Sequence, residues 1–311
     1  MSGVEFPPSL WAATAPARTS APALSGTHDT DVAIIGGGFT GLSAAIEAAR
    51  DGRSVTVLEG KAVGWGASGR NNGQVIPILT SAEPAAWVSR YGAAGERMVQ
   101  LIGNSASILF DLVREFDMPA EAEQAGWFQP AHSPGRVKLS QKRVEAWQRA
   151  GFPAELKSAA ETREILGSDF WYGGMYNPTG GHINPLALAR GMAAAAEGLG
   201  ATIFEQSPVT RFDREGAQWV IRTATGTVKA RALILATNAY SDGLWPGLAR
   251  SFIPIRFFQL ATAPLGDRAR SILPGGEGVW DTARVMFSLR RDVAGRLILG
   301  SMGSLIGGDA G

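Results

Sequence analysis

The segment "DVAIIGGGFTGLSAAIEAARDGRSVTVLEG", residues 31–60, decides the fold. Its apolar run Val32–Ile35 is typical of a short, fully buried strand. Residues 38–50 carry apolar side chains at helical spacing, and Asp51–Gly52 ends that pattern. A second β-branched run, residues 54–59, indicates another buried strand. The segment therefore predicts one βαβ unit with a right-handed crossover.

Three glycines at the turn between the first strand and the helix form the pattern G-x-G-x-x-G. Gly36 permits the tight turn, Gly38 lets a pyrophosphate approach the backbone, and Gly41 lets helix and strand pack closely. Glu59 ends the second strand, where a carboxylate would accept hydrogen bonds from an adenosine ribose. This context predicts a dinucleotide site; the alternative is a structural glycine turn with a solvated glutamate. Because Glu59 would repel a 2′-phosphate, the motif leaves NAD and FAD open.

The composition excludes several classes of function. The chain has 311 residues, 45% of them hydrophobic, and a formal net charge of +1. This near-neutral balance argues against nucleic acid as a partner, because phosphate binding needs clustered positive charge. No apolar run is long enough for a membrane span. Without cysteine, and with three scattered histidines, the chain offers no disulfide, no cysteinyl flavin link and no expected metal site.

A second glycine-rich segment, "GWGASGRNNGQV" at residues 64–75, follows the βαβ unit. It is too polar and flexible for a core strand, and its backbone N–H groups could wrap a phosphate or a ring edge. An ordinary surface loop is the alternative. Further along, the pattern predicts helices over 83–117 (broken near Gly92–Gly95), 134–151 and 184–200, two strands within 201–213, a hairpin followed by a buried strand Leu233–Ala236, and a hairpin over 285–301.

Four ordered motifs resemble one family. The segments "IIGGGFTGLSAA", "VTVLEGKAVGWGASGRNNGQ", "TGGHINPLALARGMAAAAEGLGATIFEQSPV" and "ALILATNAY" look like the D-amino-acid-oxidase-like FAD-dependent oxidoreductases. Within them the chain is most similar to the bacterial γ-glutamylputrescine oxidoreductase type, and the resemblance covers residues 31 to about 265. It implies FAD, bound non-covalently, as the cofactor.

The resemblance also implies which residues touch FAD. Asn72 departs from the commoner glycine of the second motif, which puts the path of that loop in question, and many flavoproteins have glycine where Asn238 stands. The implied cofactor-binding residues are Gly36, Gly38, Gly41, Glu59, Lys61, Gly66, Ala67, Ser68, Arg70, Asn71, Gly73, Val209 (near adenine), Thr237 and Asn238 (near the phosphates).

Two residues are candidates for the substrate side. His182 lies in a stretch that approaches the flavin face in the family, so it could bind substrate or tune the flavin; the alternative is a histidine that supports the helix beginning near Asn184. Arg256 could meet a substrate carboxylate, or be a surface or structural arginine. No catalytic side chain is named, because the flavin itself would carry the chemistry.

The resemblance implies an α/β fold, α+β overall, with a Rossmann-like FAD-binding domain interleaved with a mixed-sheet substrate domain. We expect residues 28–80 and 175–250 in the first, and 81–174 and 251–311 in the second. Residues 1–27 would form a Pro/Ala-rich extension. Because relatives continue past Gly311, we also expect a chain truncated at its C-terminus.

The expected activity is oxidation of the C–N bond of an amine or amino acid, γ-glutamylputrescine being the first candidate. Hydride transfer to flavin would leave an imine that water hydrolyses, and oxygen or another acceptor would take the electrons. Two alternatives stay open from the residues: an NAD-linked dehydrogenase, and an inactive or non-catalytic nucleotide-binding fragment. With no export signal, we expect the cytoplasm.

Overall fold

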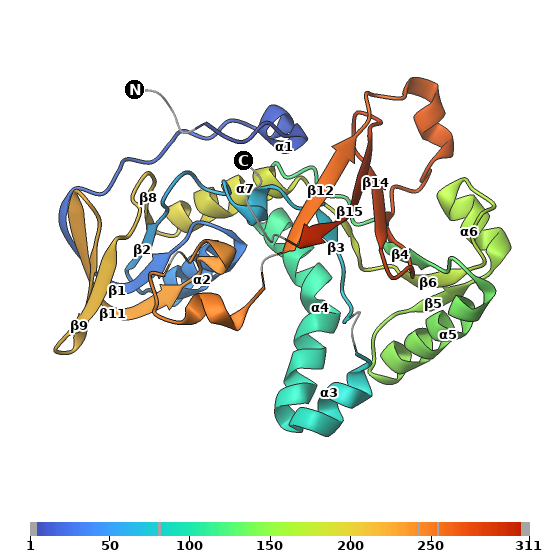
Figure 1. The fold of residues 1–311 in the computed structure, drawn as a ribbon, viewed down its shortest axis with the longest axis horizontal. Coiled ribbons are helices and arrows are strands. Elements are labelled where there is room, and N and C mark those ends of the chain that lie inside the picture. The colour runs from blue at the N-terminus through green and yellow to red at the C-terminus, as the bar shows by residue number, and fades with distance from the viewer. Residues whose placement is uncertain (1–4, 80–81, 242, 254, 306–311) are drawn as a thin grey trace. The chain divides into compact units, whose positions relative to one another are not determined.

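The computed structural model describes residues 5–79, 82–241, 243–253 and 255–305, without the side chains of Arg256 and 302–305 (Figure 1). The chain forms two compact units, each described by itself below. Unit 1 comprises Met1–Asn71, Phe116–Ala120 and Asn184–Pro254, and unit 2 comprises Asn72–Glu115, Glu121–Ile183 and Ile255–Gly311.

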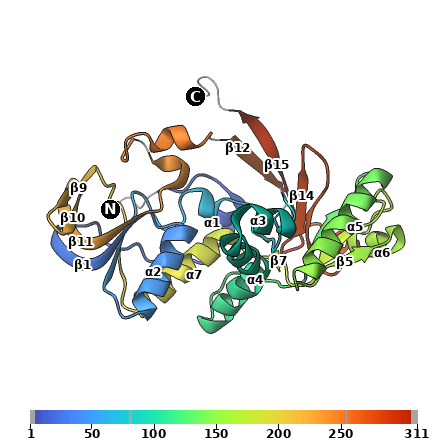
Figure 2. The ribbon, with the colours of Figure 1, turned by 90° about the horizontal axis from the view of Figure 1, so that it is seen from below.

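Unit 1 is built on a six-stranded sheet with the order β8-β2-β1-β11-β10-β9. The first four strands in that order are mutually parallel, and β10 pairs antiparallel with β11 and β9. Helices α2 and α7 lie side by side (Figure 2). The elements are β1 (Gly26–Ile35), α2 (Phe39–Arg50), β2 (Val55–Leu58), α7 (Pro185–Gly198), β8 (Thr202–Phe204), β9 (Arg211–Glu215), β10 (Gln218–Arg222), β11 (Gly226–Leu235) and the short helix α1 (Leu10–Thr14).

The βαβ unit expected from the opening segment is present. All four residues of β2 and the last four of β1 are buried, as expected for parallel strands inside a sheet. Helix α2 buries its Leu42, Ala45 and Ile46 stripe and ends at Asp51. The predicted start of α7 is also confirmed, because the Asn184 side chain accepts a hydrogen bond from the Ala187 N–H, with Pro185 at the first helical position.

The prediction for residues 218–240 was wrong in one respect. The second strand of the hairpin and the buried strand near Leu233 form a single strand, β11. Its first half pairs with β10 up to Ala230, and its whole length pairs with β1 from Gly26 to Ile35. One strand therefore serves both the hairpin and the parallel sheet, and no turn residue interrupts it.

Unit 2 contains a seven-stranded mixed sheet with the order β12-β15-β14-β13-β4-β6-β5, and a two-stranded sheet β3-β7. Gly92, at φ 53°, breaks the expected helical stretch into α3 and α4. The elements are β3 (Gln74–Val75), α3 (Pro84–Tyr91), α4 (Ala93–Glu115), β4 (Trp127–Pro130), α5 (Pro134–Arg149), β5 (Glu155–Lys157), α6 (Ala159–Leu166), β6 (Gly174–Asn177), β7 (Gly181–His182), β12 (Ile255–Ala261), β13 (Gly278–Trp280), β14 (Phe287–Arg291) and β15 (Leu297–Leu305).

The core of unit 2 is centred on two tryptophans. Trp127 on β4 and Trp147 on α5 are both 0% exposed and pack with Met175 and Val144.

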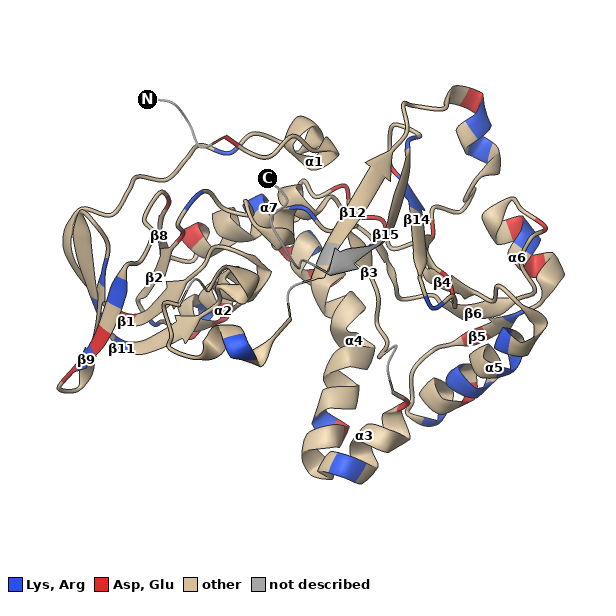
Figure 3. Cartoon of the chain, in the orientation of Figure 1, with Lys and Arg blue, Asp and Glu red and all other residues tan. Residues whose placement is uncertain are grey.

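Four 3₁₀ turns complete the described elements of the chain: Ala67–Gly69, Asn238–Tyr240, Leu248–Ser251 and Gly266–Ser271. Basic and acidic side chains alternate along α6 (Figure 3). No helix in the described ranges is long and apolar enough to cross a membrane.

The boundaries of the two units differ from the expected ones. Residues 72–80 belong to unit 2, because the Gln74 side chain donates to the Val279 carbonyl and accepts from the Trp127 indole. Residues 116–120 belong to unit 1, where Met118 packs against Gly191 of α7. Long-range contacts set these boundaries, and the sequence pattern did not reveal them.

Candidate functional site

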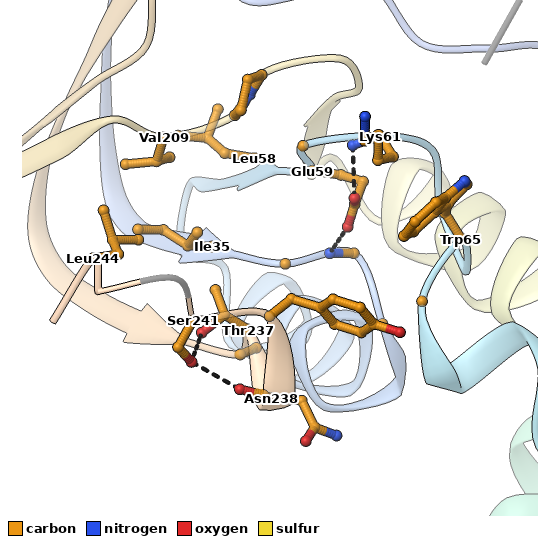
Figure 4. Close-up of a pocket in the computed structure, with 18 of the residues that line it drawn as sticks. Ile35, Leu58, Glu59, Lys61, Trp65, Val209, Thr237, Asn238, Ser241 and Leu244 are labelled. Carbon is orange, nitrogen blue, oxygen red and sulfur yellow. Dashed lines mark hydrogen bonds between the residues drawn. The ribbon is translucent and has the colours of Figure 1, made fainter. Parts of the chain in front are cut away.

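A pocket of about 920 Å³ opens in unit 1 at the carboxyl ends of β1, β2 and β11 (Figure 4). This volume lies in the upper part of the range for small-molecule sites, and this edge of a parallel sheet is where such folds bind ligands. The pocket is lined by apolar side chains and by carboxylate, hydroxyl, amide and amine groups. The apolar side chains are Ile35, Leu58, Val209 and Leu244, and the polar ones are Glu59, Lys61, Thr237, Asn238 and Ser241.

The glycine turn lies against other backbone so closely that side chains are excluded. Gly36 has φ 112°, and a Cβ there would lie 2.6 Å from the Ala236 carbonyl oxygen. A Cβ at Gly41 would lie 2.0 Å from the Gly36 carbonyl oxygen. Both distances are far inside van der Waals contact, so the turn needs glycine at these positions. The Gly36, Gly37 and Phe39 N–H groups already donate to Leu58, Glu59 and Ser68, so an anion would be attracted here by the positive end of the α2 dipole.

Ser68 connects the second glycine-rich segment to the start of α2. Its hydroxyl accepts a hydrogen bond from the Phe39 N–H at 3.0 Å. A Cβ at Gly38 would lie 2.8 Å from that hydroxyl oxygen, so the glycine makes room for the serine. The segment around Ser68 therefore closes over the helix start and lines the pocket beside it.

Glu59 is half-buried and faces the pocket from the end of β2. One carboxylate oxygen accepts from the Gly37 N–H and the other from the Lys61 N–H, both at 2.8 Å (Figure 4). Burial raises the pKa of this carboxyl above its usual range, although these backbone donors act in the opposite sense. Each oxygen retains capacity for a further hydrogen bond, as a ribose diol requires.

The turn after β11 forms another wall of the pocket. Asn238 adopts φ 48°, the left-handed region that favours glycine and, next, asparagine. The Thr237 and Ser241 hydroxyls lie 2.8 Å apart, and Ser241 donates to the Asn238 carbonyl. Asparagine can therefore occupy the position where many flavoproteins have glycine, because the turn requires a positive φ and asparagine tolerates it.

Aromatic and cationic side chains gather at one end of the pocket. The Arg70 guanidinium lies 5.1 Å from the centre of the Trp65 ring and donates to the Tyr240 hydroxyl at 2.6 Å. The Lys61 ammonium lies 5.8 Å from the centre of the same ring. Cations over an indole face are attracted to it and leave positive charge near the pocket. Lys61, Trp65 and Tyr240 line the pocket, whereas Arg70 contacts Trp65 and Tyr240 without lining the pocket itself.

His182 lies in unit 2 and is 1% exposed. Its Nδ1 is 3.4 Å from an Arg290 amino group, so Nδ1 acts as the acceptor and the proton belongs on Nε2. Nε2 lies 3.3 Å from a Glu123 carboxylate oxygen, without a hydrogen bond of good geometry among the described residues. Burial lowers the pKa of the His182 imidazole, Glu123 opposes this effect and Arg290 adds to it.

Asn72 and Gly73 sit beside this cluster. The Asn72 side chain donates to the Ser288 hydroxyl at 2.7 Å, and the Asn72 backbone carbonyl accepts from the Arg290 Nε–H at 2.7 Å. Gly73 has φ 79°, and a Cβ there would lie 2.1 Å from the Ile183 carbonyl oxygen. The asparagine that departs from the family pattern therefore has a place against β14, and the loop path at Gly73 depends on glycine.

The predicted site residues fall into separate groups. Unit 1 brings together at the pocket Gly36, Gly38, Glu59, Lys61, Gly66, Ala67, Ser68, Val209, Thr237 and Asn238. Gly41, Arg70 and Asn71 adjoin it in unit 1, whereas Gly73 and His182 belong to unit 2. Arg256 stands in β12, and its side chain lies outside the described residues.

Two charged residues that are at most 2% exposed were not predicted from the sequence. Arg290 is 1% exposed and donates to the carbonyls of Asn72 and Ile183, and burial lowers its pKa to about 10, so it stays protonated at neutral pH. Glu205 is 2% exposed and follows β8. The available signal was charge next to apolar strand residues, one glutamate in "TIFEQ" and two arginines in "FSLRR".

Comparison with known proteins identifies the class. The family model described as "FAD dependent oxidoreductase" matches residues 31–310, so the chain belongs to this family. Its members use FAD, and their class acts on amines or amino acids. This result resolves the choice between NAD and FAD that the glycine motif left open.

Named relatives are consistent with that class. The chain is 34% identical over 296 residues to "Probable oxidoreductase OrdL" of Rhizobium meliloti, covering 94% of this chain and 68% of the relative. It is 32% identical over 300 residues to "Gamma-glutamylputrescine oxidoreductase" of Escherichia coli, covering 95% and 70%. The chain thus spans about two thirds of the length of these curated relatives.

Solved structures share the fold. L-proline dehydrogenase from P. horikoshii matches with a TM-score of 0.74 at 24% identity, covering 91% of this chain and 72% of that one. Glycine oxidase from Geobacillus kaustophilus matches with a TM-score of 0.67 at 20% identity, covering 89% and 73%. The mixed α/β architecture is therefore that of known FAD-binding folds.

The described residues fit FAD on their own geometry. The turn at Gly36 and Gly41 excludes side chains and leads into the start of α2 beside the pocket, where the helix dipole favours a pyrophosphate. Glu59 offers carboxylate oxygens toward the cavity, and Val209 and Leu244 offer an apolar wall for a flat base. Among the described residues, no group of three or more His, Asp or Glu is placed to hold a metal ion.

Proposed function

We propose that this chain oxidises the C–N bond of an amine or amino acid, and that γ-glutamylputrescine is the first substrate to test. The substrate proposal is supported by the 32% identity to the Escherichia coli enzyme of that name. Unit 1 would bind the cofactor, and unit 2 would provide the substrate side.

The observation that carries the cofactor role is the pairing of the glycine turn with Glu59 at one pocket. We assign the pyrophosphate to the turn at Gly38 beside the start of α2, the adenosine ribose to Glu59, and the adenine to the wall formed by Val209. Ser68 would stand beside the phosphates, and Lys61 would flank the adenosine half. The positive charge of Lys61 and Arg70 suits the two negative charges of a pyrophosphate.

FAD, when bound, supplies the acceptor for a hydride from the substrate carbon. The substrate must present a neutral amine, so its ammonium proton goes to solvent before the C–H bond breaks. The imine that forms takes up water at carbon and releases ammonia or an amine, which leaves an aldehyde or a keto acid. Oxygen would accept the two electrons and become hydrogen peroxide; another acceptor would serve equally for the C–N step.

His182 is a weak candidate for direct substrate contact, because it is 1% exposed and enclosed by Glu123 and Arg290. We propose that it acts through the loop at Asn72 and Gly73. Arg256 stays a candidate for a substrate carboxylate, to be tested by the effect of Arg256→Met on KM rather than on kcat.

The deciding experiment is the visible spectrum of the purified chain, followed by anaerobic mixing with candidate amines. Flavin bands that survive desalting, and that bleach with γ-glutamylputrescine faster than with glycine or sarcosine, support the whole proposal. Bleaching only by another amine rejects the substrate and keeps the reaction. A chain that stays colourless after addition of FAD contradicts the function of this chain.

A further inference from the structure

The N-terminal residues 5–24 are attached to unit 1 along their length. Trp11 on α1 is 3% exposed, and Leu24 is 0% exposed. The Arg190 side chain donates to the carbonyls of Ala15 and Pro16. This segment, called the N-terminal strap below, lies outside the 31–310 range that the family model matches.

Two direct contacts, and a third through Glu205, connect the strap to one segment of the pocket wall, residues 63–71. The Trp65 indole N–H donates to the Glu5 carbonyl at 3.1 Å. The Trp11 indole N–H donates to the Asn71 carbonyl at 2.9 Å. At the other end, the Val63 N–H donates to Glu205 at 2.7 Å, and Glu205 in turn holds the strap. The strap therefore fixes the beginning, the middle and the end of this wall.

Glu205 is the centre of the attachment. One of its oxygens accepts from the Ser20 hydroxyl and the Ala21 N–H, both at 2.7 Å. The other accepts from Val63 and lies 3.3 Å from an Arg18 amino group. A carboxylate that is 2% exposed needs such partners to compensate for the loss of water. Arg18 couples the strap to the pocket wall through this contact, and its other amino group pairs with Glu197 of α7 at 2.7 Å.

The segment that the strap holds includes residues that line the pocket. Gly64, Trp65, Gly66, Ala67 and Ser68 all line the pocket (Figure 4 labels Trp65). Ser68 in turn closes onto the start of α2 through the Phe39 N–H. A shift at Val63 or Asn71 would therefore move the groups that face the glycine turn.

We propose that the N-terminal strap is part of the cofactor site, and that Arg18 and Glu205 are positioning residues that hold residues 63–71 against a bound dinucleotide. This inference rests on the proposed function for its ligand. It assigns to these residues the affinity for FAD, without a part in the C–N chemistry.

A structural role alone predicts a different result. If the strap only stabilised unit 1, any substitution that lowers stability equally would weaken FAD binding equally. Ile221→Val on β10 serves as that control, because Ile221 is 0% exposed and does not line the pocket. Arg222→Met serves as a charge control, because its guanidinium pairs with the exposed Glu215 at 2.9 Å.

The experiment measures the Kd of the apoprotein for FAD by flavin fluorescence quenching, together with the Tm of each apoprotein. We expect Arg18→Met to raise Kd by at least about tenfold, equal to about 1.4 kcal/mol, because Glu205 loses its cationic partner. Arg18→Lys should recover part of the affinity. Trp11→Phe, which loses the indole N–H and part of the ring packing, should raise Kd by about two- to fivefold. Both controls should stay within about twofold of the unsubstituted chain.

Hydrogen exchange adds a readout that does not depend on FAD. The Val63 amide should exchange faster in Arg18→Met than in Ile221→Val at matched Tm, because it loses a well-positioned acceptor. Equal Kd values for FAD in the unsubstituted chain and in Arg18→Met overturn the inference and leave the proposed function intact. An unsubstituted chain that never binds FAD overturns both.

Discussion

Glu59 in unit 1 and His182 in unit 2 are both titratable groups that burial pushes toward their neutral forms. Burial raises the pKa of the Glu59 carboxyl and lowers the pKa of the His182 imidazole. The difference lies in what surrounds them. Glu59 faces a cavity and keeps free acceptor capacity, whereas His182 is enclosed by Glu123 and Arg290. The first arrangement suits a ligand, and the second holds the protein's own loop in place.

The comparison also separates two uses of close packing. At the pocket, glycines bring backbone together so that the turn before α2 lines the cavity with backbone alone. In the His182 cluster, the Arg290 guanidinium donates to the backbone carbonyls of Asn72 and Ile183. The predictions below test each side of this contrast, beginning with the largest expected effect.

Gly41→Val should abolish FAD binding and cost at least about 3 kcal/mol of stability. The reason is the 2.0 Å approach that any Cβ at this position would make to the Gly36 carbonyl oxygen. FAD retention after desalting and denaturant unfolding measure the two effects. Gly198→Ala is the matched control, because a Cβ there meets nothing within 4 Å. A Gly41→Val chain that keeps its flavin would contradict the account of the turn.

Arg290→Met should lower the free energy of unfolding of unit 2 by about 2–4 kcal/mol, because two buried carbonyls lose a charged donor. Urea unfolding followed by tryptophan fluorescence measures this effect. Arg291→Met, next on the same strand, should cost about 1 kcal/mol, since its side chain is less buried and donates to loop carbonyls. Equal costs for the two variants would remove the distinction between the closed cluster and the strand surface.

Glu59→Gln should raise the Kd for FAD by about ten- to a hundredfold, the effect of replacing charged hydrogen bonds by neutral ones. In the unsubstituted chain, affinity should also weaken as the pH falls through the raised pKa of Glu59, because protonation removes an acceptor. The variant should lack this pH dependence. A titration of Kd against pH for both chains decides the point, and parallel curves would reject Glu59 as the ribose acceptor.

His182→Asn should change how stability depends on pH, and this pH effect is the smallest of the series. The folded-state pKa of His182 is lowered, so below pH 6.5 the unfolded chain binds the proton first and folding loses free energy. The variant should lose less stability on acidification than the unsubstituted chain.

Glu59→Gln should change the pH dependence of the unfolding free energy in the opposite direction. The pKa of Glu59 is raised, so the folded chain binds its proton first and gains stability as the pH falls. Removing Glu59 should therefore steepen the loss on acidification, whereas removing His182 should flatten it. Unfolding free energies over the acidic range test both, and slopes that move in the same direction would break the comparison.

Local patterns predicted much of the fold. The βαβ unit, the helix start near Asn184 and the hairpin over 285–301 all follow from contiguous residues, and the structure confirms them. The length of β11 could not be predicted in this way, because its pairing with β1 depends on residues about two hundred positions earlier. The surroundings of His182 have the same origin, since Arg290 is 108 positions away.

The sequence by itself determined the dinucleotide motif, because glycine spacing and strand-end acids are local requirements of phosphate and ribose binding. FAD followed from the resemblance of four ordered motifs to one family, which the family match confirms. Only the tertiary structure decided which charges face the cavity and which are enclosed. Glu59 and Glu205 both follow parallel strands of one sheet, yet Glu59 opens on the pocket whereas Glu205 is covered by the N-terminal strap. Exposure depends on what packs over a residue, and that is set by contacts between segments far apart in the chain.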